Sequence, residues 1–330
     1  MTSSETKRCH FVPRTYLEKF YQDVDHKRKL VAKSKKDGKF FHPSVTSICV
    51  RKFLYTMPGE TEEDRQVIEK FYSENIEGDY NTIYDILNRP KIIKISHTQR
   101  ELIISTVITL LFRNPFILDR FNEFWSRTID RLYERAENSA SRSIMIDKDT
   151  INIDKTPKAE LQQKSNFENK QIFNISHMQF ALRLIELRIN DDITVTEVED
   201  HHEYITSDNP VSYTNPQAGI TGQFDPSNFL RLPINTKKCI VISPLAIHDN
   251  NIQTIYRRKV KANSALLDTI MVNRLQHHFS DKLLIGSFKS LRDLDNQLKY
   301  TETELSEIAK KVQNEMLLRF NEEIRKKLKL

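Results

Sequence analysis

The chain has 330 residues, of which 38% are hydrophobic, enough to bury the core of one large domain or two ordinary ones. Its net charge of +6 suits an anionic partner but does not demonstrate one, because nucleic-acid binding depends on clustered charge. The six glycines form neither a dinucleotide-binding fingerprint nor a phosphate-binding loop, which excludes these two classes of nucleotide-binding protein.

Three observations indicate the compartment. The three cysteines lie far apart, without the Cys-x-x-Cys spacing of a redox or zinc site. The first ten residues contain no apolar segment typical of a secretory signal. The longest apolar stretch, LIISTVITLLF (102–112), is much shorter than the roughly 20 residues of a membrane-spanning helix. We therefore expect a cytoplasmic protein without membrane contact.

The N-terminal part is predicted to form a short helix and a hairpin. Pro13 suits the first position of a helix over 14–21, where its missing N–H costs nothing. Asp37-Gly38 is a strong hairpin signal, and it predicts a lysine-rich β-hairpin over 29–41.

The middle of the chain is predicted to be helical, because apolar residues recur there at spacings of three and four. A further helix follows the region of strands. The long helix that begins at 157 is expected to break near Asn174. The predicted helices span 62–75, 80–87, 97–112, 116–134, 157–188 and 262–278.

After residue 190 the chain changes to short β-branched and aromatic runs separated by turn residues, which predicts a small antiparallel sheet. The segment KLLIGSF (282–288) is expected to add an edge strand. The predicted fold class is therefore α+β, with a predominantly helical body, a small antiparallel sheet and an N-terminal β-hairpin.

The predicted organisation is a disordered leader over 1–9, a single domain over 10–298 and a C-terminal amphipathic helix over 299–330. Within the domain, the polar segment 137–157 is expected to be a loop or linker. The last helix carries an apolar stripe that can pack on the body of the protein or on a partner helix, so self-association through it is expected. The stripe consists of Leu305, Ile308, Val312, Met316, Phe320, Ile324 and Leu328.

Several segments, taken together, resemble one family. The opening HFVPRTYLEKF (10–20) fits the pattern His-x-Val-Pro-x-x-Tyr-Leu-x-x-Phe, and YITSDNPV (204–211) places a Thr-Ser-Asp-Asn-Pro turn after a strand. The chain is similar to the family DUF4238, a domain of unknown function found mostly in bacteria. The resemblance implies a helical body with a small sheet. The other matching segments are TSICVRKFLYT (46–56), EKFYSENIEG (69–78), LLFRNP (110–115), LRLPINTKKCIVISP (230–244) and IMVNRLQ (270–276).

Polar residues of these segments stand at junctions between predicted elements, where side chains from distant parts of the chain can meet in one cleft. His10, Arg14, Glu77 and Asp208 are the candidate catalytic residues. An imidazole titrates near neutral pH, so His10 suits an acid or base role, although it can equally hydrogen-bond the first turn. Arg14 suits a phosphate clamp.

Arg113 and Asp208 each have two interpretations. Arg113 can clamp a phosphate together with Arg14, or it can be a buried arginine paired with Glu77 or Asp208. Asp208 and Glu77 can hold Mg²⁺ or Mn²⁺, because these ions take carboxylate ligands. Alternatively, Asp208 or Asn209 forms an Asx-turn with a backbone N–H two residues later.

The predicted hairpin is the densest basic run in the sequence. Lysines beside aromatic residues can follow a phosphate backbone, but lysines also protect the exposed edge of a sheet from pairing with another chain. The candidate substrate-binding residues are Tyr16, Arg113, Asn209, Lys33, Lys35 and Lys36.

The main functional hypothesis is a hydrolase of a phosphate-containing substrate, of the nuclease type found in bacterial conflict or phage-defence systems, with RNA or DNA as its partner. The alternative is a non-catalytic module that binds nucleic acid or an anionic small molecule. A third interpretation makes the motif residues a scaffold that joins the opening segment to the Thr-Ser-Asp-Asn-Pro turn. An open cleft favours the first two, whereas burial with mutual pairing favours the third.

Overall fold

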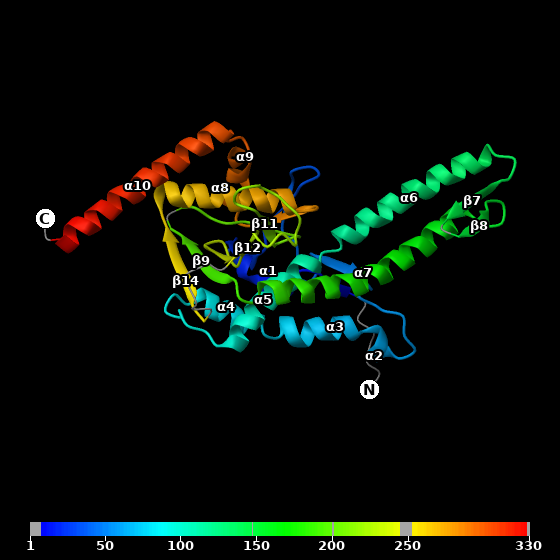
Figure 1. Ribbon diagram of the computed structural model, residues 1–330, viewed down its shortest axis with the longest axis horizontal. Coiled ribbons are helices and arrows are strands. Elements are labelled where there is room, and N and C mark those ends of the chain that lie inside the picture. Colours follow the sequence, from blue (N-terminus) through cyan, green and yellow to red (C-terminus); the bar gives the residue numbers. More distant parts are fainter. Residues whose placement is uncertain (1–7, 147, 200, 245–252, 329–330) are drawn as a thin grey trace.

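The computed structural model describes residues 8–146, 148–199, 201–244 and 253–328, with side chains as far as residue 318. Figure 1 shows a central body from which two helical projections extend in opposite directions. One is the hairpin of helices α6 (Phe116–Glu137) and α7 (Lys158–Arg188), and the other is helix α10 (Glu302–Leu328). The predicted α+β class is confirmed.

Helix α5 (His97–Phe112) lies inside the body because its sequence is apolar on almost every side. It begins with a capping box, in which the Ser96 side chain accepts the Gln99 N–H and the Gln99 side chain accepts the Ser96 N–H. The helix has the bounds predicted from the sequence. Its Ile104 and Ile108 belong to the largest buried cluster of the protein.

A five-stranded sheet with the order β11-β12-β13-β9-β14 shares this cluster with α5. Helix α8 (Ala262–Phe279) covers the other face of the sheet (Figure 1). The predicted antiparallel pairing holds for four strands, but β14 pairs parallel with β9. The strands are β9 (Asp192–Val198), β11 (Ser212–Thr214), β12 (Phe229–Pro233), β13 (Lys238–Ser243) and β14 (Ile255–Val260).

A four-stranded sheet with the order β10-β15-β4-β5 contains the predicted N-terminal hairpin, which is confirmed. Gly38 has a φ of 71° in its turn, a conformation that glycine adopts readily. The strand expected at an edge, β15, lies inside the sheet instead, because Leu284 and Ile285 are buried between its two neighbours. The strands are β4 (Ala32–Ser34), β5 (Phe40–Phe41), β10 (Thr206–Ser207) and β15 (Leu283–Ile285).

The described fold begins earlier than predicted. Strand β1 (Arg8–His10) pairs with β6 (Val50–Lys52), so two residues assigned to the disordered leader over 1–9 are in a strand. The reason is that the Cys9 side chain is only 1% exposed, and burial of its apolar surface holds the strand in place. Residues 1–7 of the predicted leader lie outside the described residues.

The segment 137–157, which was expected to be a loop or linker, contains two strands instead. Strands β7 (Ser143–Ile146) and β8 (Asp149–Asn152) form a hairpin at the tip of the α6–α7 projection (Figure 1). The hairpin is stable there because Ile144 packs in a buried cluster with Ile129 and Tyr133 of α6. The polar composition of the segment conceals these few apolar contacts. Helix α7 continues through Asn174 without the predicted break.

Helix α10 begins where the amphipathic tail was predicted to begin. Ile308 and Val312 of the predicted stripe are buried, and α10 packs on α8. Met316 is 55% exposed, so the burial of the stripe does not extend to this residue. The side chains of Phe320, Ile324 and Leu328 lie outside the described residues. Self-association through this helix stays a prediction.

One helical stretch, His97–Glu137, is long and apolar enough to cross a membrane by composition alone, but 72% of its most apolar window is buried inside the fold. Such burial is what the core helix of a globular body shows. The expectation of a cytoplasmic location stays a prediction.

The remaining elements depart from the predictions in three places. The helix predicted over 62–75 is interrupted at Gln66, whose φ of −105° and ψ of 9° are not helical. Helix α9 and the strand pair β2–β3 were not predicted. These elements are α1 (Arg14–Leu17), η1 (Glu18–Phe20), β2 (Gln22–Val24), β3 (Lys27–Lys29), α2 (Glu62–Arg65), α3 (Val67–Tyr72), the π-helix η2 (Ser73–Glu77), α4 (Tyr80–Asn88) and α9 (Phe288–Gln297).

Tyr16 of α1 ties the opening segment to both sheets. Its side chain is fully buried, and its hydroxyl donates to the Pro233 carbonyl oxygen at 2.8 Å. The hydroxyl oxygen also lies 2.5 Å from Thr206 Oγ1, and the threonine is the donor there because the tyrosine proton is already used. Tyr16, a candidate substrate-binding residue, therefore holds the fold together.

The first prediction concerns this hydroxyl. Tyr16→Phe should lower the free energy of unfolding by about 1–3 kcal/mol, because it leaves a buried carbonyl and a buried hydroxyl without their partner. Urea denaturation measures the change. Tyr21→Phe is the matched control, since the Tyr21 hydroxyl has no hydrogen-bond partner among the described residues. Equal stabilities of the two variants would contradict the assigned role.

Candidate functional site

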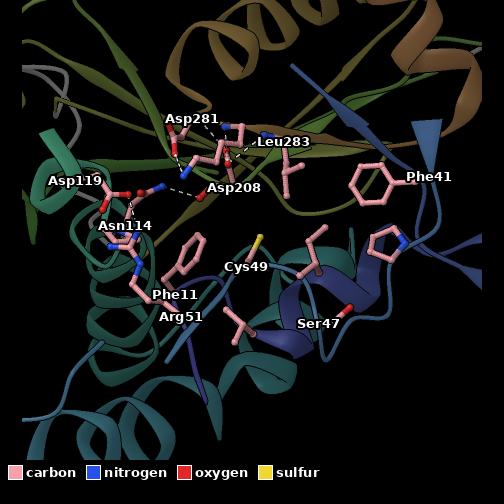
Figure 2. A pocket seen from close by; sticks show the side chains of 15 residues that line it. Phe11, Phe41, Ser47, Cys49, Arg51, Asn114, Asp119, Asp208, Asp281 and Leu283 are labelled. Atoms are coloured by element: carbon pink, nitrogen blue, oxygen red, sulfur yellow. Dashed lines mark hydrogen bonds and ion pairs between the residues drawn. The ribbon is translucent and has the colours of Figure 1, made fainter. Parts of the chain in front are cut away.

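A cleft of about 450 Å³ opens where several of the matching segments meet. One wall consists of residues 47–51, which include the first two residues of strand β6, and the other consists of residues 281–283 and Asp208. Figure 2 shows that polar side chains, among them Arg51 and Asp119, gather at one end of the cleft, whereas Phe41 and Ser47 line the other end. We call this space the central cleft.

Asp208 connects the end of β10 to the start of its neighbour β15 at the base of the central cleft. Its carboxylate accepts three backbone N–H bonds, from Asp281 at 2.9 Å, Lys282 at 2.7 Å and Leu283 at 3.1 Å (Figure 2). Its side chain is almost fully buried. Burial raises the pKa of Asp208 to about 6, although the three N–H donors favour the ionised form. A raised carboxyl pKa in a cleft is a mark of functional sites.

The turn that contains Asp208 is not the predicted Asx-turn. Asp208 cannot close such a turn, because the residue two positions later is Pro210, which has no N–H. The Ser207 hydroxyl accepts the Asn209 N–H at 3.2 Å instead. The Asn209 side chain, expected to bind substrate, donates to the Phe279 carbonyl oxygen at 3.0 Å and so fastens the turn to α8.

Asn114 links the helices to this turn. Its side-chain N–H donates to the Asp208 carbonyl oxygen at 2.7 Å, and its side-chain oxygen accepts the Phe116 N–H at 2.8 Å at the start of α6. One amide therefore satisfies an unpaired donor of a helix terminus and a carbonyl of the sheet. It also positions α6 along the central cleft.

Arg113, expected to clamp a phosphate, is fully buried beside the cleft. Its Nη2 donates to Glu77 at 2.8 Å and to the His10 carbonyl oxygen at 2.7 Å, and its guanidinium lies 4.0 Å from the centre of the Tyr72 ring. The alternative interpretation, a buried arginine paired with Glu77, is thus the one that the structure confirms. Glu77, which was predicted to be catalytic and to hold a metal, is engaged in this pair.

His10 and Arg14 lie near each other but not on the central cleft. Burial lowers the pKa of His10, and its Nε2 has no hydrogen-bond partner among the described residues. Arg14 is exposed, and the described part of the chain offers it no hydrogen bond or ion pair. The structure therefore brings His10, Glu77 and Arg113 together, and it places Asp208 in a separate network.

Two of the three candidate lysines in the N-terminal hairpin form contacts within the fold. Lys33 forms an ion pair with Asp295 at 2.6 Å. Lys35 donates to the carbonyl oxygens of His277 and Ser280 at 2.8 and 2.7 Å, and so caps the end of α8. Only Lys36, the third candidate, is exposed. A continuous basic track for a phosphate backbone is not formed by these three side chains.

The central cleft contains charged residues that the sequence did not indicate. Arg51 pairs with Asp119 at 2.6 Å, and Lys282 pairs with Asp281 at 3.2 Å. Both pairs also line a more open hollow of about 560 Å³ that continues from the cleft and adds Arg120. Arg51 lies in the matching segment TSICVRKFLYT, which was the only available signal for it.

Two other kinds of chemistry receive no support from the described residues. Cys49 lines the cleft, but burial raises its thiol pKa well above the ordinary value, so it is no thiolate nucleophile. No group of three His, Cys, Asp or Glu side chains in the described parts of the chain can hold a metal ion. Asp208 and Glu77 lie in separate networks, and the expected Mg²⁺ or Mn²⁺ stays a prediction.

The segments that build the central cleft are those that carry the sequence resemblance. A family model described as "Protein of unknown function (DUF4238)" matches residues 8–290. The chain belongs to this family. No curated protein and no solved structure matches the chain. The DUF4238 match includes every wall of the central cleft and ends before α10.

A substitution at Arg113 tests whether its role is structural. Arg113→Leu should lower the free energy of unfolding by about 2–4 kcal/mol, because it removes one partner of a buried ion pair and leaves the His10 carbonyl unsatisfied. Arg14→Ala, which removes an exposed arginine, should change it by less than about 0.5 kcal/mol. Chemical denaturation measures both variants, and a fully stable Arg113→Leu protein would refute the assignment.

The pKa of Asp208 predicts a pH dependence of stability. Its folded pKa of about 6 exceeds the ordinary value of 3.8, so the native state keeps a proton that the unfolded chain loses. The free energy of unfolding should therefore fall, by about 2–3 kcal/mol from this group, as the pH rises from about 4 to about 6.

Asp208→Asn should remove this part of the slope while leaving the contribution of Asp191, whose pKa burial raises to about 7. The slope of stability against pH is the measurement, because the variant also weakens hydrogen bonds at every pH. Identical slopes in both proteins would rule out a raised Asp208 pKa.

Proposed function

We propose that this DUF4238 protein is a hydrolase that acts on a phosphate-containing substrate in the central cleft, with a phosphodiester of RNA or DNA as the expected substrate. The observation that carries the proposal is the position of Asp208, a buried carboxyl with a raised pKa at the base of a cleft that also presents Arg51 and Lys282. A carboxyl that titrates near the working pH suits proton transfer.

The two cations suit the substrate's negative charge. The Arg51 side chain is 32% exposed and that of Lys282 is 70% exposed, so both can reach a ligand from the solvent side of the cleft. Their carboxylate partners are also partly exposed, and a phosphate oxygen can replace such a partner at little cost, since exposed ion pairs are weak. A guanidinium beside a phosphoryl group stabilises the charge that develops during its transfer.

The roles differ from those expected from the sequence. Asp208 is retained as the acid or base, and Arg51 and Lys282 replace Arg14 and Arg113 as the phosphate-binding cations. Glu77, paired with the buried Arg113, supports the opening segment. The bacterial conflict or phage-defence setting is part of this proposal and rests on the sequence resemblance alone.

A binding module without catalysis is the second candidate. The three N–H bonds that fix the Asp208 carboxylate favour a rigid, permanently occupied acceptor over a group that exchanges protons. In that case, nucleic acid or an anionic small molecule would bind to Arg51 and Lys282 without turnover. The two candidates share the cleft and differ in whether product forms.

An activity assay distinguishes them. The purified full chain is incubated with labelled RNA and DNA, in EDTA, Mg²⁺ or Mn²⁺, and product is quantified on gels. Asp208→Asn should lower the cleavage rate by about 10²-fold or more. Arg51→Ala should lower the cleavage rate by a similar factor and should also weaken substrate binding. Arg89→Ala, which removes an exposed arginine directly after α4 and outside the cleft, is the charge-matched control.

Retention of full cleavage by Asp208→Asn in a folded protein would refute the catalytic proposal. Substrate binding by the wild-type protein without product, lost in Arg51→Ala and kept in Arg89→Ala, would establish the binding module. Stability of each variant is measured beside activity, because Asp208 also holds the sheet together.

A further inference from the structure

A second cavity, of about 280 Å³, lies between the five-stranded sheet and α8. Its lining comes from β9, β12, β13, β14 and one side of α8. It shares no lining residue with the central cleft or with the open hollow beside it. We call it the sheet cavity.

Strand register gathers polar side chains on this face of the sheet. Arg231 stands opposite Val241, which in turn stands opposite Thr194, and Thr196 stands opposite Arg258. The residues between them in sequence point to the other face and fill the main core, because side chains alternate along a strand. The sheet cavity therefore combines two arginines with two threonines, on the face that α8 only partly covers.

Arg231 is the unusual member of this set. Its side chain is buried, with 6% of the residue exposed, and only its Nη1 forms hydrogen bonds, to Thr214 Oγ1 at 2.7 Å and to the Phe229 carbonyl oxygen at 3.3 Å. The described residues contain no ion-pair partner for it. The buried Arg113 and Arg188, by contrast, each contact a carboxylate. An unpaired buried charge destabilises a fold, so an anion from outside is the natural complement.

The other groups in the sheet cavity leave one positive charge in excess. Arg258 contacts Asp268, and the second oxygen of Asp268 accepts the Tyr204 hydroxyl at 2.6 Å. This pair is neutral, and the Arg231 charge remains. The hydroxyls of Thr194, Thr196 and Ser243 also have no hydrogen-bond partner within the described parts of the chain, although they line the same space.

We propose that the sheet cavity is a binding site for a small molecule that carries a phosphate group. Arg231 would anchor the phosphate at the bottom of the cavity, and Arg258 and the three hydroxyls would donate to its remaining oxygens. Donors approach from several strands and from different directions, which suits the tetrahedral arrangement of phosphate oxygens better than a flat carboxylate. The cavity is just below the range of about 300–1,000 Å³ for drug-sized ligands, so it suits a small phosphomonoester rather than a polymer.

This site is independent of the proposed hydrolase activity, because none of its residues lines the central cleft. Occupation would stabilise the folded chain in proportion to ligand concentration, since a ligand that binds only the native state raises the free energy of unfolding. It would also neutralise the Arg231 charge and tighten the contact between the sheet and α8.

The test uses the full chain with inorganic phosphate as the probe and acetate at equal ionic strength as the carboxylate comparison. Binding to the protein should broaden the ³¹P resonance of phosphate, and phosphate should raise the melting temperature of the protein in a saturable manner. Acetate should have little effect on the melting temperature. Arg231→Met should abolish both phosphate responses when it is combined with Arg51→Ala, which removes a phosphate-binding cation of the central cleft. Without phosphate, Arg231→Met should melt at the same temperature as the wild-type protein or higher, because it removes an unpaired buried charge.

A second pair of variants keeps the proposal testable if Arg231→Met misfolds. Arg258→Met should weaken the phosphate response at least tenfold, whereas Lys259→Met, which removes the next charge on the same strand, should leave it unchanged. These variants are compared in an Arg51→Ala background, so that phosphate bound in the central cleft does not contribute to the response.

Three results would overturn the proposal. The first is the absence of a saturable phosphate response in the wild-type protein. The second is a response that survives Arg231→Met or Arg258→Met but disappears in Arg51→Ala, which would place the phosphate in the central cleft. The third is an equal response to acetate, which would show a general anion effect. None of these depends on cleavage of RNA or DNA.

Discussion

The carboxylate of Asp208 is the constraint on which the candidate site depends. A buried carboxylate needs hydrogen-bond donors, and the consecutive N–H groups of residues 281–283 supply three of them. These bonds hold the end of β10 against β15, and through the Asn114 amide the same turn is fastened to the start of α6. The Asp208 side chain thus holds together the wall of the central cleft that residues 281–283 form with it. Removing it would affect shape and chemistry together.

Buried arginines show which charges serve the fold and which are left for a ligand. Arg113 pairs with Glu77, and Arg188 contacts Asp191. Each of these two guanidinium groups has a carboxylate partner, so its charge is balanced within the chain. Arg231 has only neutral acceptors, and its charge is not balanced. The presence of a carboxylate partner, rather than burial alone, distinguishes a structural arginine from one that is available to bind an anion.

Sequence reasoning found the helices well and the site only in part. The long apolar run of α5 indicates where this helix lies because it is a local feature of the sequence and depends on no distant contact. The hairpin β7–β8 was missed because its stability comes from contacts with α6, which no local pattern records. The same limit applies to the site. Arg51 and Asp119 are 68 positions apart and come together only in the folded chain. Arg113 was selected because it belongs to a motif, but it is buried and has a structural role.

The environment of Asp208 also determines which way its proton would move during the proposed reaction. In the free protein a pKa of about 6 leaves the carboxyl mostly ionised at neutral pH. A phosphate anion in the same cleft would raise that pKa further, because a nearby like charge disfavours the ionised form, and Arg51 and Lys282 would offset only part of the effect while they neutralise the phosphate. Substrate binding would then favour the protonated form of Asp208. In the proposed function Asp208 therefore suits the acid that protonates the leaving oxygen better than the base that activates water.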